Sequence, residues 1–188
     1  HERFRRQRQM CIRDSNLMTQ AVDPIGENGV DLRNYGEPIG IIEARKLGAD
    51  ILDSKIDLTI AGEQSSYLLM TQLLLGRFLF GLDDDPWKND KEPAFLCAVP
   101  GFDRHFATLE GLGLKMHTVN LCSSGIDLDD LNKKLSKYPN IKGLICVPRH
   151  SNPSGEVFSD ENITNLLKIT KEYNSSFINL FDHAYLIH

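Results

Sequence analysis

Short apolar segments alternate with stretches of helical periodicity through the second half of the chain, and this alternation constrains the fold more than any other feature. The apolar segments are residues 94–99, 115–121, 142–147 and 176–181, and the helical patterns are residues 101–112, 127–138 and 159–173. Apolar strands joined by helices of about 10–15 residues form βαβ units, in which the strands run parallel and helices cover both faces of the sheet. The sequence therefore predicts an α/β fold with three layers, α/β/α, around a mostly parallel sheet.

Two further helical patterns and one short strand are expected in the first half of the chain. The helices cover residues 38–53 and 64–81, and the strand covers residues 57–61. The second of these helices is apolar enough to raise the question of a membrane span. Gln72 and Arg77 interrupt it, and it barely reaches the length of about 20 residues that a span requires, so we expect a buried helix.

Composition and charge narrow the class of protein. The 188 residues are 41% hydrophobic and 25% charged, as in a soluble globular protein, and the formal net charge of −5 argues against a general affinity for nucleic acid or for anionic membranes. The four cysteines are too few for a disulfide framework, and neither they nor the histidines show the spacing of a metal site. We therefore expect a cytoplasmic enzyme or binding domain without a metal centre.

The first 15 residues differ from the rest of the chain in charge. They hold five arginines against two acids, Glu2 and Asp14, and they lack an initiating methionine. One interpretation is a basic arm for nucleic acid or an acidic partner. The other, which we favour, is a non-native leader, because the sequence resembles translated sequencing adapter. We accordingly expect one partial domain over residues 16–188.

Polar and glycine-containing segments follow several of the expected strands. They are GEQSS (62–66), VPGFDRH (99–105), VPRHSNPSG (147–155) and FDHAY (181–185). In parallel α/β sheets, ligands bind at the carboxyl ends of the strands. The turn at Gly62 leads into a helix, so its backbone N–H groups suit a phosphate, although an ordinary capped turn has the same sequence pattern. Asp182 and Tyr185 lie three residues apart at the end of the last strand, where solvation alone does not explain an acid beside an apolar strand.

The order and spacing of these segments resemble those of the fold-type I, pyridoxal-phosphate-dependent aminotransferases of class I/II. That family combines the sequence N-P-[ST]-G with a helix and then a strand ending in D-x-A-Y, which here are residues 152–155 and 182–185. The segments DLRNYGEPIGIIEAR, PGFDRH and VPRHSNPSG are most similar to the aspartate/alanine aminotransferase branch. The resemblance covers residues 23–188, and it implies that the chain is a piece of the large domain that binds pyridoxal 5'-phosphate.

The resemblance also implies roles for individual side chains around the cofactor ring. Asp182 matches the aspartate that pairs with the protonated pyridine nitrogen, and His105 matches the histidine that contacts this aspartate. Asn152 and Tyr185 match the pair that hydrogen-bonds the phenolic oxygen of the ring. Phe102 matches the aromatic side chain that stacks on the ring face.

The phosphate of the cofactor has its own set of matching residues. Glu63, Gln64 and Ser65 align with the turn that binds this phosphate through backbone N–H groups and a hydroxyl. An acid at position 63 is unexpected beside a phosphate, because other members have a small residue there. Tyr35, in the sequence N-Y-G-x-P-x-G, matches a tyrosine that reaches the phosphate of the neighbouring subunit, which implies a homodimer.

The implied reaction is the reversible transfer of an amino group between an amino acid, which the branch suggests to be aspartate, and a 2-oxo acid. The family's catalytic lysine and its small domain lie beyond Tyr185, so we expect the chain to be a fragment that is inactive alone. Lys168 and Lys171 lie in the helix before the last strand, which is the wrong place for that lysine. Two alternatives remain open: a carbon–sulfur lyase on the same fold, and the ligand-sensing domain of a transcription regulator, for which residues 1–34 offer no winged helix.

Overall fold

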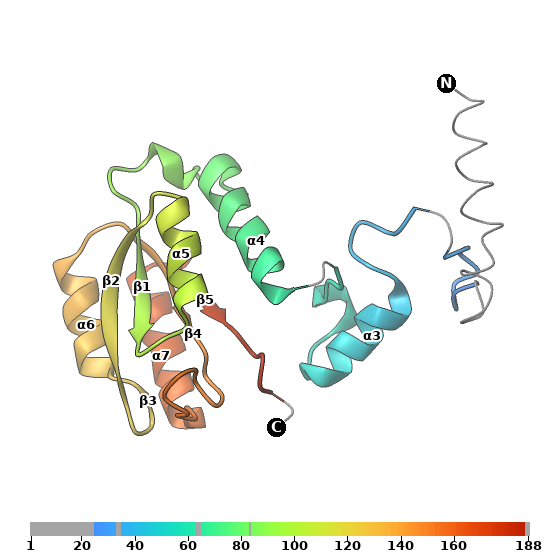
Figure 1. Ribbon diagram of the computed structural model, residues 1–188. Helices are drawn as coiled ribbons and strands as arrows, with labels where there is room; N and C mark the ends of the chain where they lie inside the picture. The colour runs from blue at the N-terminus through green and yellow to red at the C-terminus, as the bar shows by residue number, and fades with distance from the viewer. Residues whose placement is uncertain (1–24, 33–34, 63–64, 83, 187–188) are drawn as a thin grey trace. The chain divides into compact units, whose positions relative to one another are not determined.

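The computed structural model describes residues 25–32, 35–62, 65–82 and 84–186. The chain divides into two compact units, His1–Glu63 and Gln64–His188 (Figure 1). The first unit contains α3 (Ile42–Ile51), and the second contains the sheet together with most of the segments that carry the expected site.

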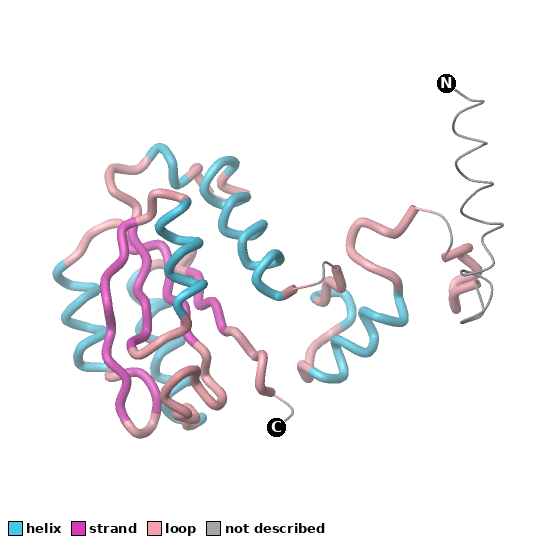
Figure 2. The backbone as a smooth tube through the Cα atoms, viewed as in Figure 1, coloured by secondary structure: helices cyan, strands magenta, loops and turns pink. Residues whose placement is uncertain are grey.

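The second unit is built on a five-stranded sheet, drawn in magenta in Figure 2. Its strands are β1 (Ala94–Val99), β2 (Lys115–Cys122), β3 (Gly125–Ile126), β4 (Ile141–Cys146) and β5 (Ile178–Phe181), in the order β3-β2-β1-β4-β5. β1 pairs in parallel with β2 and β4, β4 pairs in parallel with β5, and β3 runs antiparallel to β2. The prediction of a mostly parallel sheet is confirmed, and four of the strands were expected within two residues of their bounds.

Helices cover both faces of this sheet, as the apolar strands predict. They are α4 (Ser66–Phe80), α5 (Asp103–Gly111), α6 (Leu128–Lys137) and α7 (Asp160–Tyr173), with a short 3-10 helix at Trp87–Asn89. On β1, Leu96 belongs to the buried cluster shared with α6 and α7, whereas Phe95 belongs to the cluster shared with α4 and α5. Because successive strand residues point to opposite faces, one strand supplies both cores, and the three-layer α/β/α prediction is confirmed.

Side chains at the helix starts explain why three of these helices begin where they do. Ser65 Oγ accepts a hydrogen bond from the Tyr67 N–H, and Ser159 Oγ accepts one from the Asn162 N–H. Asp127 caps α6 in the same way. Each cap satisfies a backbone donor that has no partner inside its helix, which stabilises a helix by about 1 kcal/mol.

The short strand β3 is held by a buried asparagine rather than by its own length. Asn162 Oδ1 accepts from the Ile126 N–H (3.0 Å), and Asn162 Nδ2 donates to the Ile126 carbonyl (2.8 Å). Gly125 has a φ of +134°, and a Cβ there would lie 2.3 Å from Asn162 Oδ1. Two residues give no periodicity that a sequence pattern could report, so β3 was not predicted.

In the first unit, the strand expected at residues 57–61 is wrong. A 3-10 helix spans Ile56–Leu58, and the residues after it form no strand. The guanidinium of Arg45 donates to the carbonyls of Thr59 (2.9 Å) and Ile56 (2.7 Å), so a side chain satisfies groups that a neighbouring strand would otherwise bond. The helix expected from residue 38 begins at Ile42, because Gly40 (φ +92°) passes so close to Ala61 that a Cβ would lie 1.9 Å from the Ala61 carbonyl oxygen.

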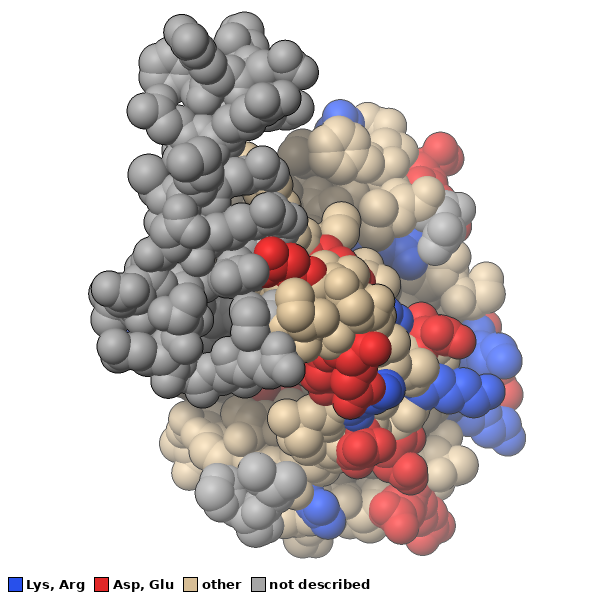
Figure 3. All heavy atoms as spheres, turned by 90° about the vertical axis from the view of Figure 1, so that its right-hand side faces the viewer, with Lys and Arg blue, Asp and Glu red and all other residues tan. Residues whose placement is uncertain are grey.

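The surface of the molecule carries charges of both signs. Acidic and basic side chains are interspersed on the face of the molecule drawn in Figure 3. None of the helices within the described ranges has the length and apolar content needed to cross a membrane. The expected leader, residues 1–15, lies outside the described residues.

Candidate active site

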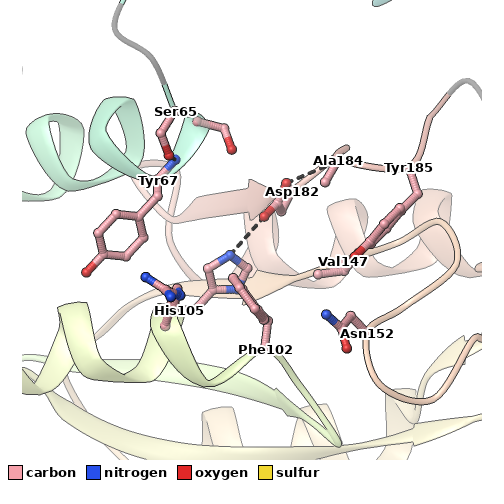
Figure 4. Close-up of a pocket in the computed structure, with 11 residues that line it drawn as sticks. Ser65, Tyr67, Phe102, His105, Val147, Asn152, Asp182, Ala184 and Tyr185 are labelled. Carbon is pink, nitrogen blue, oxygen red and sulfur yellow. Dashed lines mark hydrogen bonds and ion pairs between the residues drawn. The ribbon is translucent and has the colours of Figure 1, made fainter.

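A cavity of about 300 Å³ lies at the carboxyl ends of β1, β4 and β5. The chain passes from β1 to β2 on one side and later returns to β4 on the other side of β1, so the strand order reverses here. Such a reversal leaves a crevice in which parallel α/β proteins bind ligands. The cavity is lined by Ser65, Ser66, Tyr67, Phe102, Arg104, His105, Val147, Asn152, Asp182, Ala184 and Tyr185 (Figure 4).

A buried histidine–carboxylate pair forms one wall of the cavity. His105 lies in the first turn of α5, and Asp182 follows directly after β5; they are 4% and 7% exposed. His105 Nε2 donates to Asp182 Oδ2 at 3.0 Å, and the Ala184 N–H donates to Asp182 Oδ1 at 3.1 Å. The backbone of Asp182 is itself fixed, because its N–H continues the sheet to the Cys146 carbonyl at 2.9 Å. Both carboxylate oxygens therefore have donors, and the side chain has one orientation.

These contacts keep the carboxylate ionised. The hydrogen bond from His105 is the largest influence, and it lowers the pKa of Asp182 below its ordinary value of 3.8. Burial opposes this and raises the pKa, while the Ala184 N–H lowers it further. Asp182 thus presents a negative charge to the cavity at neutral pH, where it suits a cationic nitrogen.

The segment after β1 places an aromatic ring over the same space. Phe102 precedes the first residue of α5, and its ring meets the His105 ring edge to face, with centroids 5.2 Å apart. Gly101 makes this turn possible, because a Cβ there would lie 2.4 Å from the Ala98 carbonyl oxygen.

The turn after β4 carries Asn152 into the cavity. The Ser151 N–H donates to the Glu156 carbonyl (2.9 Å), and the Gly155 N–H donates back to the Ser151 carbonyl, so the turn is closed by its own backbone. Gly155 has a φ of +83°, which favours glycine. Asn152 and Tyr185 lie on one side of the cavity, whereas Ser65 and Tyr67 lie on the other (Figure 4).

Six of the nine residues expected at the cofactor site line this one cavity: Ser65, Phe102, His105, Asn152, Asp182 and Tyr185. Glu63 and Gln64 lie outside the described residues. Tyr35 belongs to the first unit, where its side chain is 79% exposed.

Sequence reasoning did not assign a role to five lining residues: Ser66, Tyr67, Arg104, Val147 and Ala184. Arg104 and Ala184 stand inside the segments PGFDRH and FDHAY, so their positions within these motifs could have marked them. Ser66 and Tyr67 open α4, where first-turn residues reach the cavity. Within the described ranges, no group of His, Cys, Asp and Glu side chains is arranged to hold a metal ion.

A three-layer domain with a cavity of polar and apolar side chains at the strand ends defines the class of α/β proteins that bind small organic ligands at that edge of the sheet. Within that class the chain belongs to the aspartate amino-transferase family, whose model matches residues 13–188. The expected family is therefore confirmed, and with it the fold of the aminotransferase large domain.

Individual relatives agree with this assignment. The aspartate aminotransferase of Corynebacterium glutamicum is 34% identical over 163 residues, which are 86% of this chain and 37% of that protein. A crystal structure of an aspartate transaminase from the same species is 32% identical, with a TM-score of 0.82 over 96% of this chain and 43% of that chain. The chain also shares its fold with a PLP-bound C-S lyase from Staphylococcus hominis, which is 18% identical. That match has a TM-score of 0.57 and covers 92% of this chain and 41% of the lyase chain. The chain spans about two fifths of the length of these relatives.

Proposed function

We propose that this chain forms the pyridoxal-phosphate-binding part of an aminotransferase that moves an amino group between an amino acid and a 2-oxo acid. The observation that carries the proposal is the buried pair of Asp182 and His105 in the cavity wall. An ionised carboxylate held in one orientation is the partner that a protonated pyridine nitrogen requires. Membership of the aspartate amino-transferase family supports the same reaction and cofactor.

Asp182 holds the proton at the ring nitrogen in this proposal. When bound, pyridoxal phosphate supplies an electron-accepting ring that stabilises negative charge at the substrate's α-carbon. A positive ring nitrogen strengthens that effect, and the lowered pKa of Asp182 means that the carboxylate accepts the nitrogen's hydrogen bond without taking its proton. His105 acts through Asp182, because it orients the carboxylate and keeps it ionised.

The start of α4 is the proposed phosphate site. Ser65 Oγ accepts from the Tyr67 N–H, which leaves the Ser65 hydroxyl proton free to be donated to an anion. The first backbone N–H groups of a helix point toward its N-terminus, and the helix dipole favours negative charge there. Ser65, Ser66 and Tyr67 all line the cavity, so a phosphate placed here is continuous with the ring site.

The remaining lining residues orient the ring. Asn152 and Tyr185 lie together at one side of the cavity, where an amide N–H and a phenolic O–H can donate to the ring's phenolic oxygen. Phe102, fixed against His105, covers one ring face and excludes water from it.

We further propose that the whole protein is a cytoplasmic homodimer. The 79% exposure of Tyr35 supports a role for this side chain at the phosphate of a neighbouring subunit. Cys97, Cys122 and Cys146 are free thiols, which suits a reducing compartment. Aspartate as the amino donor is supported by the named function of the C. glutamicum relative.

The cofactor site is tested by binding of pyridoxamine 5'-phosphate, which has no aldehyde and so forms no imines with surface lysines. In equilibrium dialysis, the unsubstituted chain should bind it, and Asp182→Asn should weaken binding by about 10- to 100-fold, because a charge-assisted hydrogen bond is lost. Asp57→Asn, an exposed acid in the first unit, removes the same charge and should leave binding unchanged. Equal affinities for Asp182→Asn and the unsubstituted chain would refute the assignment.

A second assay separates the proposed reaction from lyase chemistry on the same fold. For the whole protein, formation of glutamate from aspartate and 2-oxoglutarate indicates amino transfer. Release of a thiol and pyruvate from an S-substituted cysteine indicates carbon–sulfur cleavage instead. The second result without the first would replace the proposed reaction while leaving the cofactor site intact.

A further inference from the structure

Two further cavities lie beside each other between the ends of α6 and α7, which cover the same face of the sheet (Figure 1). Their volumes are about 490 Å³ and about 280 Å³, and both are lined by Leu135, Ser136 and Tyr173. α6 leads into β4 and α7 leads into β5, so these cavities lie at the amino ends of the strands. The proposed cofactor site lies at the opposite, carboxyl ends. We call the two cavities together the helix-end groove.

The groove lies where the negative ends of two helices meet. The last carbonyls of an α-helix have no partner inside the helix, and the helix dipole adds partial negative charge there. After the C-cap of α6 comes Pro139, which has no N–H to donate to these carbonyls. The end of α7 is held next to that of α6, because Tyr173 Oη donates to the Tyr138 carbonyl at 3.5 Å. A cation is therefore favoured in the groove.

The side chains that line the groove add oxygen atoms and a negative charge. Glu172 lines the smaller cavity and is exposed to solvent, so its carboxylate can meet a ligand without first breaking a buried contact. Asn140 lines the larger cavity, and its Nδ2 donates to the Lys91 carbonyl at 2.9 Å, which leaves its Oδ1 as an acceptor. Both cavities thus offer oxygen acceptors to an N–H donor.

The cations near the groove are engaged elsewhere. Lys142 is the one lysine or arginine in the described lining, and its Nζ lies 2.6 Å from Asp90 Oδ2. In the last turn of α6, Lys134 pairs with an aspartate one turn earlier, and the Nζ of Lys137 lies over the Tyr138 ring. The other lysines of the two helices lie outside the lining. The charge of Glu172 and of the helix ends is therefore available to a ligand.

The wall shared by the two cavities is apolar. Leu135 and the ring of Tyr173 line both cavities, and Ile141 and Ile169 extend this surface into the larger and the smaller one. An aliphatic chain can pack on such a wall, and an ammonium group is attracted to the face of a tyrosine ring within about 6 Å. The groove thus combines acceptors in each cavity with apolar surface between them.

We propose that the helix-end groove binds a linear aliphatic diamine. One ammonium group lies at the Glu172 carboxylate in the smaller cavity, and the other lies at Asn140 and the helix-end carbonyls in the larger cavity. The methylene chain between them covers Leu135 and Tyr173. An anion does not match this site, because every charge and dipole named above favours a cation. The inference does not depend on the cofactor site, which lies at the other edge of the sheet.

Calorimetric titration of the unsubstituted chain with putrescine, a four-carbon diamine, tests the proposal in the absence of pyridoxal phosphate. We expect saturable binding at one site. Butylamine, with one ammonium group, should bind about tenfold more weakly, and butanediol, with none, should not bind. Absence of saturable putrescine binding up to about 10 mM, or equal binding of the amine or the diol, would overturn the proposal.

A matched pair of variants separates a specific contact from general attraction to an acidic protein. Glu172→Gln keeps the size of the side chain and removes its charge, so it should weaken putrescine binding about tenfold. Glu161→Gln removes an equal charge from the first turn of the same helix and should leave binding unchanged. Both side chains are exposed, so neither substitution disturbs the core. Equal affinities of the two variants for putrescine would overturn the assignment.

Nuclear magnetic resonance locates the bound diamine independently of its affinity. On addition of putrescine, the amide resonances of residues 135–142 and 172–174 should shift, and those of Phe102 and His105 should not. Shifts at the cofactor site without shifts at the helix ends would overturn the proposal. Shifts confined to the helix ends, and lost with Glu172→Gln, would support it.

Discussion

Replacing His105 by leucine tests the energetic role of the buried pair. The substitution removes the donor to Asp182 Oδ2 but leaves the Ala184 N–H on Oδ1. Loss of a hydrogen bond to a charged group costs about 1.5–3 kcal/mol, and a wholly unpaired buried charge costs more. Because one donor remains, we expect the free energy of unfolding at pH 7 to fall by about 2 kcal/mol.

The sign of the pH dependence follows from the direction of the pKa change. The folded protein lowers the pKa of Asp182 below 3.8, so the unfolded chain binds this proton more tightly. The stabilisation is therefore complete above about pH 4, near the unfolded pKa, and is lost as the pH falls through the lower folded pKa. His105→Leu removes the largest cause of the shift, so the stabilities of the two proteins should differ most at neutral pH and converge in acid.

Urea unfolding followed by fluorescence measures both effects, because Trp87 is the single tryptophan of the chain and is buried against Phe95. His105→Gln is the matched control, since its amide N–H can reach the same carboxylate oxygen, and it should lose less than about 1 kcal/mol. A His105→Leu variant as stable as the unsubstituted chain, or a loss that is constant between pH 3 and pH 7, would refute the reasoning.

Two further predictions concern the rest of the fold. Asn162→Ala removes both side-chain hydrogen bonds to the buried backbone of Ile126 and should lower the free energy of unfolding by about 2–4 kcal/mol in urea titrations. Asn165→Ala on the exposed face of the same helix should change it by less than about 0.5 kcal/mol, and comparable values for the two variants would contradict the role of the buried amide. Burial raises the pKa of Cys97 to about 12 and that of Cys146 further, so iodoacetamide should alkylate the exposed Cys122 of the native protein and leave these two thiols unmodified until urea is added. Peptide mapping measures this, and alkylation of all three cysteines at one rate would contradict the burial of the two strands.

The sheet and its helices were predictable because their residues are buried on both faces. Apolar runs such as AFLCAV leave few alternatives to a central strand, and β1 has the predicted bounds. The segment DLTIA has a similar apolar character, yet it forms no strand. Its first two residues belong to a 3-10 helix, and the Arg45 side chain bonds the carbonyls of Ile56 and Thr59 from an earlier part of the sequence. β3 depends in the same way on Asn162, and such long-range side-chain contacts leave no local pattern.

The candidate site was predictable to the extent that its residues stand in short motifs. The motifs NPSG and DHAY contain Asn152, Asp182 and Tyr185, and all three line the cavity because strand ends meet at one edge of a parallel sheet. Their roles toward the cofactor stay predictions. Arg104 was not predicted, and the structure shows that it lines the same cavity. The turn at Glu63 and Gln64 lies outside the described residues, so its expected register stays a prediction.

Parallel pairing has a consequence for the order of events during folding. β1, β4 and β5 join residues that are far apart in the chain, such as Leu96 and Leu144, and each contact closes a long loop before it contributes stability. The cavity exists only after all three strands have paired, so a ligand finds its site late and stabilises a structure that is already formed. We therefore expect pyridoxamine 5'-phosphate to slow unfolding rather than to accelerate refolding, and cofactor loading to be the last step of maturation rather than its nucleus.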